Sequence, residues 1–249
     1  MTSTSAGNAS PGKALADSAL TLVDVHGYYG KSHVLQGVHL DVPRGAVVSL
    51  LGRNGVGKTT TLRAVLNLLP RKSGRVVVAG RDVSRWSTDT IARHGVSYMP
   101  QEAKTFPDLT VRENIEIAAS TMAGRRPIDE VLDELPALRP RLFQRAGTLS
   151  GGQQQMVAIA RSLLMNSPLV LMDEPSDGLM PKLVRELGDL IRLLSGKGMA
   201  VLLVEQNLEL ALAVSERIYV MEKGQIRLRT DPEAVRRDPS AVYKYLGVS

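Results

Sequence analysis

Residues 46–60 read AVVSLLGRNGVGKTT, an apolar run followed by a glycine-rich loop, a lysine and two threonines. From Gly52 to Thr59 the segment matches the pattern G-x-x-x-x-G-K-[ST], which binds phosphate when it lies between a strand and a helix. The flanking residues fit that context, because the apolar run predicts a strand and Thr59 to Leu69 predicts a helix. We therefore predict that this loop binds the phosphates of a nucleotide.

The residue types in the loop suit that chemistry. Gly52, Gly55 and Gly57 let the backbone turn so that its N–H groups point at phosphate oxygens, and the start of the helix adds its positive end. Lys58 reaches the β- and γ-phosphates, and the Thr59 hydroxyl ligates Mg²⁺. The predicted nucleotide-binding residues of the loop are Gly52, Arg53, Asn54, Gly55, Val56, Gly57, Lys58, Thr59 and Thr60.

A phosphate loop of this kind works with an acidic strand end that holds the metal ion. Residues 169–174 read LVLMDE, and the four apolar residues fit a central strand of a parallel sheet. Asp173 at the end of that strand can hold Mg²⁺, and Glu174 can orient or deprotonate the attacking water. Many strands end in acids, so this pattern is specific only in combination with the phosphate loop.

A second glycine-rich segment, LSGGQ at 149–153, precedes the apolar-periodic stretch QQQMVAIARSLL. One interpretation is a glycine turn in which Ser150 caps a helix. The other is a second phosphate-binding helix start, built from Ser150, Gly151, Gly152 and Gln153. Because one nucleotide needs only one such cradle, two cradles in one chain suggest that the second serves a nucleotide held by another subunit.

The remaining pattern predicts an α/β chain with a helical insert. Helical spacing without a convincing strand runs through 108–145, whereas strands and helices alternate after Gly151. Two short terminal helices are each expected to open at an Asp-Pro pair. Strands are predicted at 20–30, 33–42, 75–80, 95–100, 200–204, 217–222 and 225–230, and helices at 151–165, 182–195 and 207–215.

Composition excludes several classes of site. The chain has no cysteine, which rules out disulfides and thiolate metal sites, and His26, His33, His39 and His94 lack metal-ligand spacing. No apolar run approaches the ~18 residues of a membrane span, and the Ser- and Gly-rich start predicts a disordered tail rather than a secretory signal. The net charge of +6 is scattered and lacks interleaved aromatics, which argues against nucleic-acid binding.

Together, the phosphate loop, LSGGQ and LVLMDE resemble the ATP-binding subunit of ABC transporters over about residues 20–249. The resemblance implies a P-loop NTPase (RecA-like) core with a parallel sheet and an N-terminal antiparallel β subdomain. Its expected organisation is a disordered tail at 1–20 and one ATPase domain at 21–249. Within that domain, 21–101 and 150–249 form the nucleotide-binding core and 102–149 form an inserted α-helical subdomain.

Further positions match the family. Tyr29 resembles the aromatic residue that stacks on adenine, with Tyr28 as the rival. Gln101, after the predicted strand 95–100, resembles the glutamine that contacts Mg²⁺. Residues 176–179, SDGL, resemble the loop that crosses the dimer interface.

The resemblance also implies the cofactors ATP and Mg²⁺ and a set of partners. Two ATPase subunits pair head to tail, with each nucleotide between one chain's phosphate loop and the other's LSGGQ. The expected partners are two transmembrane permease subunits, a second ATPase that is a different chain, and an extracytoplasmic solute-binding protein acting through the permease. The chain is then expected to be peripheral, on the cytoplasmic face of the cell membrane, without a nucleic-acid partner.

One position departs from the family. The strand after the acidic one usually ends in a histidine that contacts the γ-phosphate, but residues 204–207 read VEQN and place Gln206 there. Glutamine hydrogen-bonds phosphate or water but carries no proton at neutral pH. Either Gln206 supports hydrolysis beside Glu174 and Lys58, or the chain holds a slow site in an asymmetric pair. The intact Glu174 favours an active enzyme.

VEQN, GRNGVGKTT, EPSDGLMP and the ending YLG resemble the ATPases of branched-chain amino acid importers, with urea and short-chain amide importers close behind. Our leading hypothesis is an ATPase that powers uptake of branched-chain amino acids. A urea or amide importer and a weakly active regulatory subunit remain alternatives. The single domain and the short insert argue against a soluble ABC ATPase that acts on DNA or ribosomes. The sequence lacks the N-K-x-D motif of a GTPase, and a kinase would not explain LSGGQ.

Overall fold

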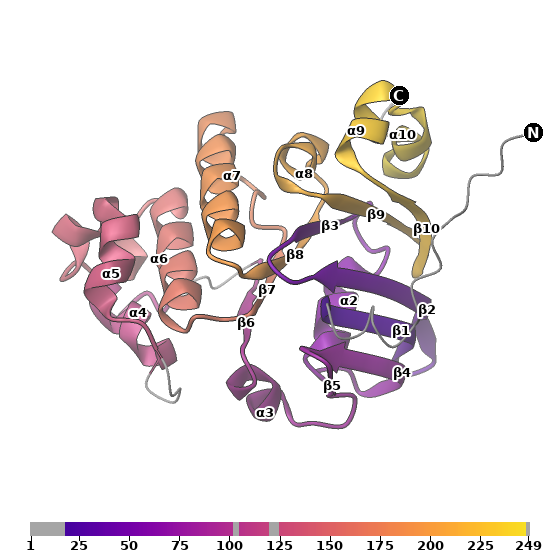
Figure 1. The fold of residues 1–249 in the computed structure, drawn as a ribbon, viewed down its shortest axis with the longest axis horizontal. Coiled ribbons are helices and arrows are strands. Elements are labelled where there is room, and N and C mark those ends of the chain that lie inside the picture. The colour runs from indigo at the N-terminus through magenta and orange to yellow at the C-terminus, as the bar shows by residue number, and fades with distance from the viewer. Residues whose placement is uncertain (1–17, 102–104, 120–124, 248–249) are drawn as a thin grey trace, which may run out of the picture.

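The computed structural model describes residues 18–101, 105–119 and 125–247, which form two sheets (Figure 1). The antiparallel sheet has the order β2-β1-β4-β5, and the larger sheet has the order β10-β9-β3-β8-β7-β6. In the larger sheet every neighbouring pair is parallel except β9 and β10. The strands are β1 (Ser18–Tyr29), β2 (Ser32–Pro43), β3 (Val47–Leu51), β4 (Arg71–Val78), β5 (Arg81–Asp82), β6 (Val96–Met99), β7 (Leu169–Asp173), β8 (Ala200–Glu205), β9 (Arg217–Glu222) and β10 (Gln225–Thr230).

The helices surround the larger sheet and form a separate lobe at one end of it (Figure 1). Helix α2 packs between the two sheets, α7 and α8 cover the opposite face, and α4, α5 and α6 make up the lobe. The helices are α2 (Lys58–Val65), α3 (Thr88–Arg93), α4 (Val111–Ala119), α5 (Ile128–Glu134), α6 (Gly151–Leu164), α7 (Pro181–Gly196), α8 (Leu208–Val214), α9 (Pro232–Arg237) and α10 (Ser240–Leu246), with 3-10 turns at Pro136–Arg141 and Ala146–Thr148.

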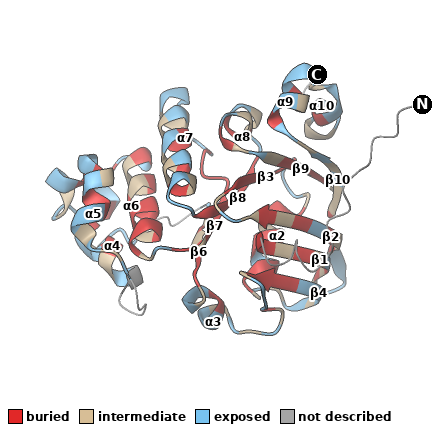
Figure 2. Cartoon of the chain, in the orientation of Figure 1, coloured by how far each residue is buried: buried red, intermediate tan, exposed pale blue. Residues whose placement is uncertain are grey.

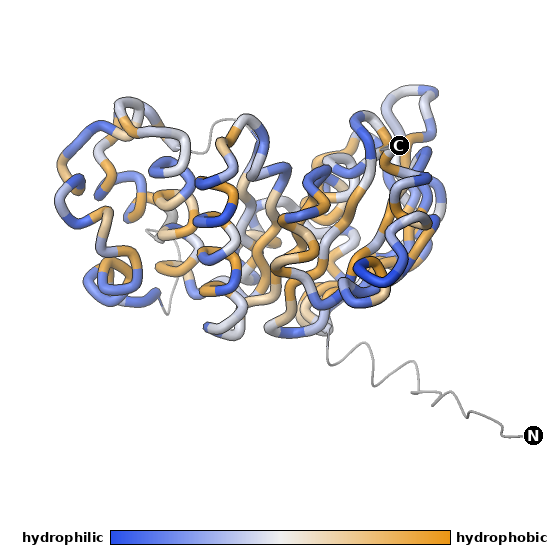
Figure 3. The backbone as a smooth tube through the Cα atoms, turned by 90° about the horizontal axis from the view of Figure 1, so that it is seen from above, coloured by the Kyte–Doolittle hydropathy of each residue, from blue (hydrophilic) through white to orange (hydrophobic). Residues whose placement is uncertain are grey.

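The central strands are apolar on both faces because both faces are covered. Along β7, Leu169 and Leu171 join the cluster beneath α2, whereas Val170 and Met172 join the cluster shared with α6 and α7. Strands β3 and β8 are likewise buried along their whole length (Figure 2). In Figure 3 the apolar segments run together through the middle of the molecule. Alternate residues facing two covered sides explain why these strands appear in the sequence as continuous apolar runs.

The fold class expected from the sequence is confirmed, and the differences lie at the ends of elements. Helix α2 ends at Val65 rather than Leu69, because Asn67 adopts a left-handed conformation with φ 56° and donates to the carbonyls of Val83 and Trp86. Strand β4 begins at Arg71, earlier than predicted, and α3 was not predicted. The Asp231 carboxylate caps α9 as expected, whereas α10 begins one residue after its Asp-Pro pair.

The predicted segments at the edges of the domain have mixed outcomes. Strand β1 begins at Ser18, so three residues assigned to the disordered tail lie in a strand, and the rest of that tail lies outside the described residues. Between 102 and 149 the described elements are helical except for an isolated bridge between Thr110 and Arg145. These helices share a hydrophobic cluster with α6 and the larger sheet.

Gly224 joins three parts of the structure. Its N–H donates to the Val56 carbonyl in the phosphate loop over 2.8 Å, and its carbonyl accepts from the Gln36 N–H of β2 over 2.9 Å. Its φ is +77°, and a Cβ at this position would lie 2.0 Å from the Val34 carbonyl oxygen. Only glycine fits both the backbone angle and the space.

We therefore predict that Gly224→Ala lowers the free energy of unfolding by about 3 kcal/mol or more, because left-handed backbone strain adds to a backbone collision. The matched control is Gly80→Ala, which has a φ of +81° but open space within 4 Å. Gly80→Ala should lower the free energy of unfolding by only about 1 to 2 kcal/mol, which is the cost of the left-handed backbone conformation without a collision. Equal losses in urea unfolding of the two variants would contradict the close contact with Val34.

Candidate nucleotide site

The carboxyl ends of β3, β8 and β7 meet at one edge of the larger sheet. In open parallel sheets this edge is where ligands bind. It carries a cavity of about 240 Å³ next to the predicted phosphate loop. The cavity is lined by Asn54, Gly55, Gly57, Lys58, Thr59, Thr60, Gln101 and Glu174.

Lys58 is the buried cation of the site, with only 4% of its surface exposed. Its Nζ donates to the carbonyls of Gly52 at 2.8 Å and Arg53 at 3.0 Å, and it lies 2.9 Å from Glu174 Oε1. A buried ammonium requires such partners. Because a phosphate would compete with Glu174 for the same ammonium, anion binding and the Lys58–Glu174 ion pair are coupled.

Thr59 and Asp173 place two oxygen donors side by side. The Thr59 hydroxyl donates to Asp173 Oδ1 over 2.9 Å, and the Tyr98 hydroxyl donates to Asp173 Oδ2 over 3.2 Å. Burial raises the pKa of Asp173, and burial together with the Asp173 charge raises the pKa of Tyr98. A hydroxyl and a carboxylate are ligands that Mg²⁺ accepts, so the residues present fit the metal expected from the sequence.

Gln101 lines the same cavity. Its Nε2 donates to Asp177 Oδ2 over 3.1 Å, which joins the end of β6 to the loop after Glu174. Its side chain is exposed, so the amide oxygen is available to a metal or water. Of the three predicted metal ligands, Thr59 and Gln101 therefore line the cavity, and Asp173 lies behind Thr59, to which it is hydrogen-bonded.

Glu174 has an unusual backbone and both carboxylate oxygens engaged. Its φ is +45°, which is uncommon for a residue with a side chain, and its N–H donates to the Val204 carbonyl at 2.9 Å. Oε1 pairs with Lys58 and Oε2 accepts from Gln206 Nε2 at 3.0 Å. Strained backbone held in place by its surroundings is frequent at functional sites.

The three polar residues at the end of β8 do three different things. Glu205 is buried, and its carboxylate accepts the N–H groups of Ser176 at 2.9 Å, Gln206 at 3.1 Å and Asn207 at 3.2 Å. The Asn207 side chain caps α8 by accepting the Leu210 N–H at 3.0 Å. Gln206 contacts two residues that line the cavity: its Nε2 donates to Asn54 Oδ1 at 2.6 Å and to Glu174 Oε2 at 3.0 Å. The segment is thus both a strand end with a helix cap and an edge of the site.

The two tyrosines that end β1 have different surroundings. The Tyr28 ring stacks on His33, with ring centroids 4.3 Å apart, and the Arg71 guanidinium lies 3.9 Å from its centroid. Tyr29 points to the other side of the strand, where its hydroxyl accepts from Arg63 of α2 over 3.2 Å. The tyrosine on the side of the phosphate-loop helix is therefore Tyr29, which favours it over Tyr28 as the residue that stacks on a base.

The LSGGQ segment lies apart from this cavity and begins α6. Ser150 Oγ accepts the Gln153 N–H at 3.4 Å, and Gln153 Oε1 accepts the Ser150 N–H at 3.1 Å, which completes a capping box. Gly151 and Gly152 form the first turn. None of these four residues lines the cavity at the phosphate loop, so within one chain the two predicted cradles are separate.

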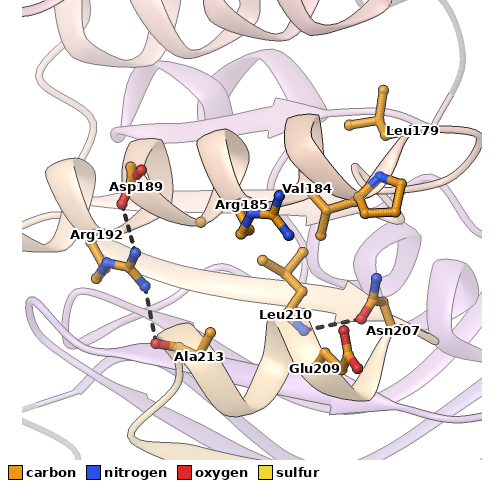
Figure 4. Close-up of a pocket in the computed structure, with 11 residues that line it drawn as sticks. Leu179, Val184, Arg185, Asp189, Arg192, Asn207, Glu209, Leu210 and Ala213 are labelled. Atoms are coloured by element: carbon orange, nitrogen blue, oxygen red, sulfur yellow. Dashed lines mark hydrogen bonds and ion pairs between the residues drawn. The ribbon is translucent and has the colours of Figure 1, made fainter.

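A larger groove of about 560 Å³ lies between α7 and α8 (Figure 4). Arg192 spans it by binding Asp189 at 2.7 Å and the Ala213 carbonyl at 3.1 Å. Its lining includes Asn207 and Leu179, which follow Gln206 and the Glu174 loop, but no residue of the phosphate loop. It is therefore not the nucleotide cavity, in spite of its size.

The phosphate loop lies between β3 and α2, and the next two strands of the sheet, β8 and β7, end in the acidic residues Glu205 and Asp173. This arrangement defines a P-loop nucleotide-binding protein. The ABC transporter family model matches residues 35–177. The chain belongs to the ATP-binding proteins of ABC transporters. As a member, it is an ATPase whose hydrolysis is coupled to transport, in a family that works with transmembrane permease subunits.

Two kinds of relative match at similar identity. The high-affinity branched-chain amino acid transport ATP-binding protein BraG of Pseudomonas aeruginosa is 36% identical over 92% of this chain and 99% of the relative. The lipopolysaccharide export system ATP-binding protein LptB of Haemophilus influenzae is also 36% identical, over 92% and 98%. A probable branched-chain amino acid transport ATP-binding protein, LivF of Archaeoglobus fulgidus, is 34% identical over 83% and 89%.

Solved structures give the same family. A nucleotide-free ATP-binding cassette from an ABC transporter superimposes with a TM-score of 0.79 at 26% identity, covering 93% of this chain and 99% of that one. An ABC transporter cassette in its ADP conformation gives 0.78 at 27%, covering 92% and 99%. In the part of the chain that is described, no helix combines the length and apolar character that a membrane span requires.

Glu205 provides a test of how the site is held. We predict that Glu205→Gln lowers the free energy of unfolding by about 1 to 3 kcal/mol at neutral pH, because the new amide group faces backbone N–H donors. The exposed neighbour Glu209→Gln is the matched control and should change it by less than about 0.5 kcal/mol.

The pH dependence has a defined sign. Burial raises the pKa of Glu205 above its ordinary 4.5, so its contribution to stability is full below 4.5 and declines as pH rises through the higher folded value. The stability gap between wild type and Glu205→Gln should therefore narrow as pH rises above 4.5. A gap that widens in chemical unfolding over this range would contradict the burial of the carboxylate.

Proposed function

We propose that this chain hydrolyses ATP at the cavity beside the phosphate loop and thereby powers an importer of branched-chain amino acids. The observation that carries the proposal is that Lys58, Thr59 and Glu174 line one cavity and that Asp173 is hydrogen-bonded to Thr59 at its edge. Together these groups supply a cation for the phosphates, oxygen ligands for a metal and a base for water.

The geometry supports distinct roles for the catalytic residues. Lys58 binds the β- and γ-phosphates in exchange for its ion pair with Glu174. Glu174, once released, orients or deprotonates the attacking water. Gln206 positions that water or the γ-phosphate from its place between Asn54 and Glu174. The magnesium ligands are Thr59, Asp173 and Gln101, and Tyr29 stacks on the adenine.

The separation of the two cradles within one chain supports a paired arrangement. Ser150, Gly151, Gly152 and Gln153 of one subunit would then bind the nucleotide seated on the phosphate loop of the other. Gly151 at the start of this helix is exposed, so an anion can approach the helix N-terminus there. We propose a second, different ATPase chain as the partner.

The lobe of α4, α5 and α6 offers a surface for a membrane partner. Phe143 is 81% exposed and Phe106 is 49% exposed, and Ile117 of α4 is also exposed at 46%. Phe106 and the segment that holds Phe143 are hydrogen-bonded to α4, so these side chains belong to one region, and a contiguous exposed apolar patch is typical of an interaction site. We propose that this lobe docks on two permease subunits at the cytoplasmic face of the membrane, with an extracytoplasmic solute-binding protein delivering cargo to the permease.

The assignment of the cargo rests on sequence resemblance, because the transported molecule is not expected to contact this chain. BraG and LivF favour branched-chain amino acids, and urea or short-chain amides remain the second candidate. The similar identity of LptB makes lipopolysaccharide export a competing function. The Gln206 amide in place of a titratable side chain keeps a weakly active, regulatory subunit as a further alternative.

Glu174→Gln tests the catalytic assignment. It keeps the shape and the contact with Gln206 but removes the base, so ATP turnover of the assembled complex should fall by about 10²- to 10⁴-fold. ATP binding should persist, and a nucleotide-bound pair should accumulate in size-exclusion chromatography. Gln206→Ala should lower turnover to a smaller extent. Unchanged turnover in Glu174→Gln would support the regulatory alternative instead.

Co-purification tests the transport assignment. The tagged chain, isolated in mild detergent from its own cells, should bring down two polytopic permeases and a second ATPase. The associated binding protein should bind leucine, isoleucine or valine in preference to urea and amides in calorimetric titration. Recovery of lipopolysaccharide-export components, or of soluble proteins only, would reject the importer.

A further inference from the structure

The carboxyl-terminal segment, from β9 to Gly247, surrounds the first residues of the phosphate loop. Leu51, the last residue of β3, is fully buried in a cluster with Val242 and Leu246 of α10. A Cβ on Gly52 would lie 2.6 Å from the Met221 carbonyl oxygen of β9, so the two backbones are in close contact. Leu51 and Gly52, the first residue of the loop, are thus packed against α10 and β9.

The next residue, Arg53, lies against the last described turn. Gly247 ends α10 in the left-handed conformation with φ +70°, and its N–H donates to the Tyr243 carbonyl at 2.9 Å. A Cβ on Gly247 would lie 3.1 Å from Cζ and Nη1 of Arg53 and 3.3 Å from its Nε. The guanidinium therefore lies against the bare backbone of this glycine.

This packing bears on nucleotide binding through two carbonyl groups. The carbonyls of Gly52 and Arg53 are the backbone acceptors that hold the Lys58 ammonium. An interaction that holds Gly52 and Arg53 in place therefore also holds the Lys58 ammonium in place. The exposed Arg53 side chain makes no hydrogen bond or ion pair within the described part of the chain, and its guanidinium lies against Gly247.

We infer that Gly247 and Arg53 form a positioning pair, through which the carboxyl-terminal turn sets the phosphate loop for nucleotide binding by Lys58. The inference rests on the assignment of the phosphate loop as the ATP site proposed above. Neither residue is catalytic, because both act through the carbonyl that orients the lysine. The glycine at position 247 permits the left-handed turn, and a Cβ there would press on the Arg53 guanidinium, which would have to shift by a few tenths of an ångström.

The experiment measures the dissociation constant of a fluorescent ATP analogue with Mg²⁺ on the full chain. Gly247→Ala and Arg53→Ala should each weaken binding by about three- to tenfold, as expected when a hydrogen bond to the lysine is disturbed. The double variant should bind no more weakly than the weaker single variant, because both changes break one contact. Gly80→Ala, with similar backbone strain but open surroundings, should bind as the wild type does.

Additive losses in the double variant, or a Gly247→Ala affinity equal to that of Gly80→Ala, would overturn the inference. If Gly247→Ala does not fold, the Arg53 variants provide the test. Arg53→Lys should keep an affinity for the analogue closer to that of the wild type than Arg53→Ala does. A wild-type affinity of Arg53→Ala would overturn the inference. Lys58→Ala separates this inference from the proposed function. If Lys58→Ala binds the analogue normally, the phosphate-loop assignment itself fails.

Discussion

The buried ammonium of Lys58 is the constraint on which the site is built. A charge with 4% exposure is tolerated only when oxygen atoms surround it. Two of these are carbonyls of its own loop and the third belongs to Glu174, which follows β7 more than a hundred residues later. Burying one cation therefore fixes the loop after β3 and the acidic end of β7 relative to each other. The parallel sheet supplies the alignment, because β8 lies between these strands and presents Gln206 at the same edge.

Electrostatics and topology thus reinforce each other. Strand β8 ends in Glu205, whose carboxylate collects three backbone N–H groups and fastens the loop after Glu174 to the end of the neighbouring strand. Helix α6 is tied to the same loop, because the buried Gln155 side chain donates to the Pro175 carbonyl. A movement of α6, and with it the lobe of α4 and α5, is therefore mechanically linked to the position of Glu174. Such a link is what coupling of hydrolysis to a membrane partner requires.

Local signals in the sequence were sufficient to predict the class of fold and the family. The phosphate loop, the apolar strands and the Asp231 cap depend on residues a few positions apart, and each appears in the structure as predicted. For Ser150 a helix cap was one of two interpretations, and the structure shows the cap, completed by Gln153 as a capping box. The predictions that fell short concern contacts between distant segments. Helix α2 was predicted too long because Asn67 is held by carbonyls near Trp86, and the choice between Tyr28 and Tyr29 needed the positions of His33 and Arg63. The role of Glu205 had no signal in sequence at all, because its partners include a backbone N–H on another strand's loop.

The capping box at the start of α6 has one more consequence. Ser150 and Gln153 already satisfy each other's N–H groups in the single chain, so that helix start is stable without any anion. In the paired arrangement that we propose, a phosphate bound by another subunit would have to replace these hydrogen bonds, so the net gain per contact would be small. Two chains joined through such an interface would separate readily once the nucleotide had been cleaved. The helix cap would therefore favour a dimer that forms and dissociates in every cycle over a permanent one.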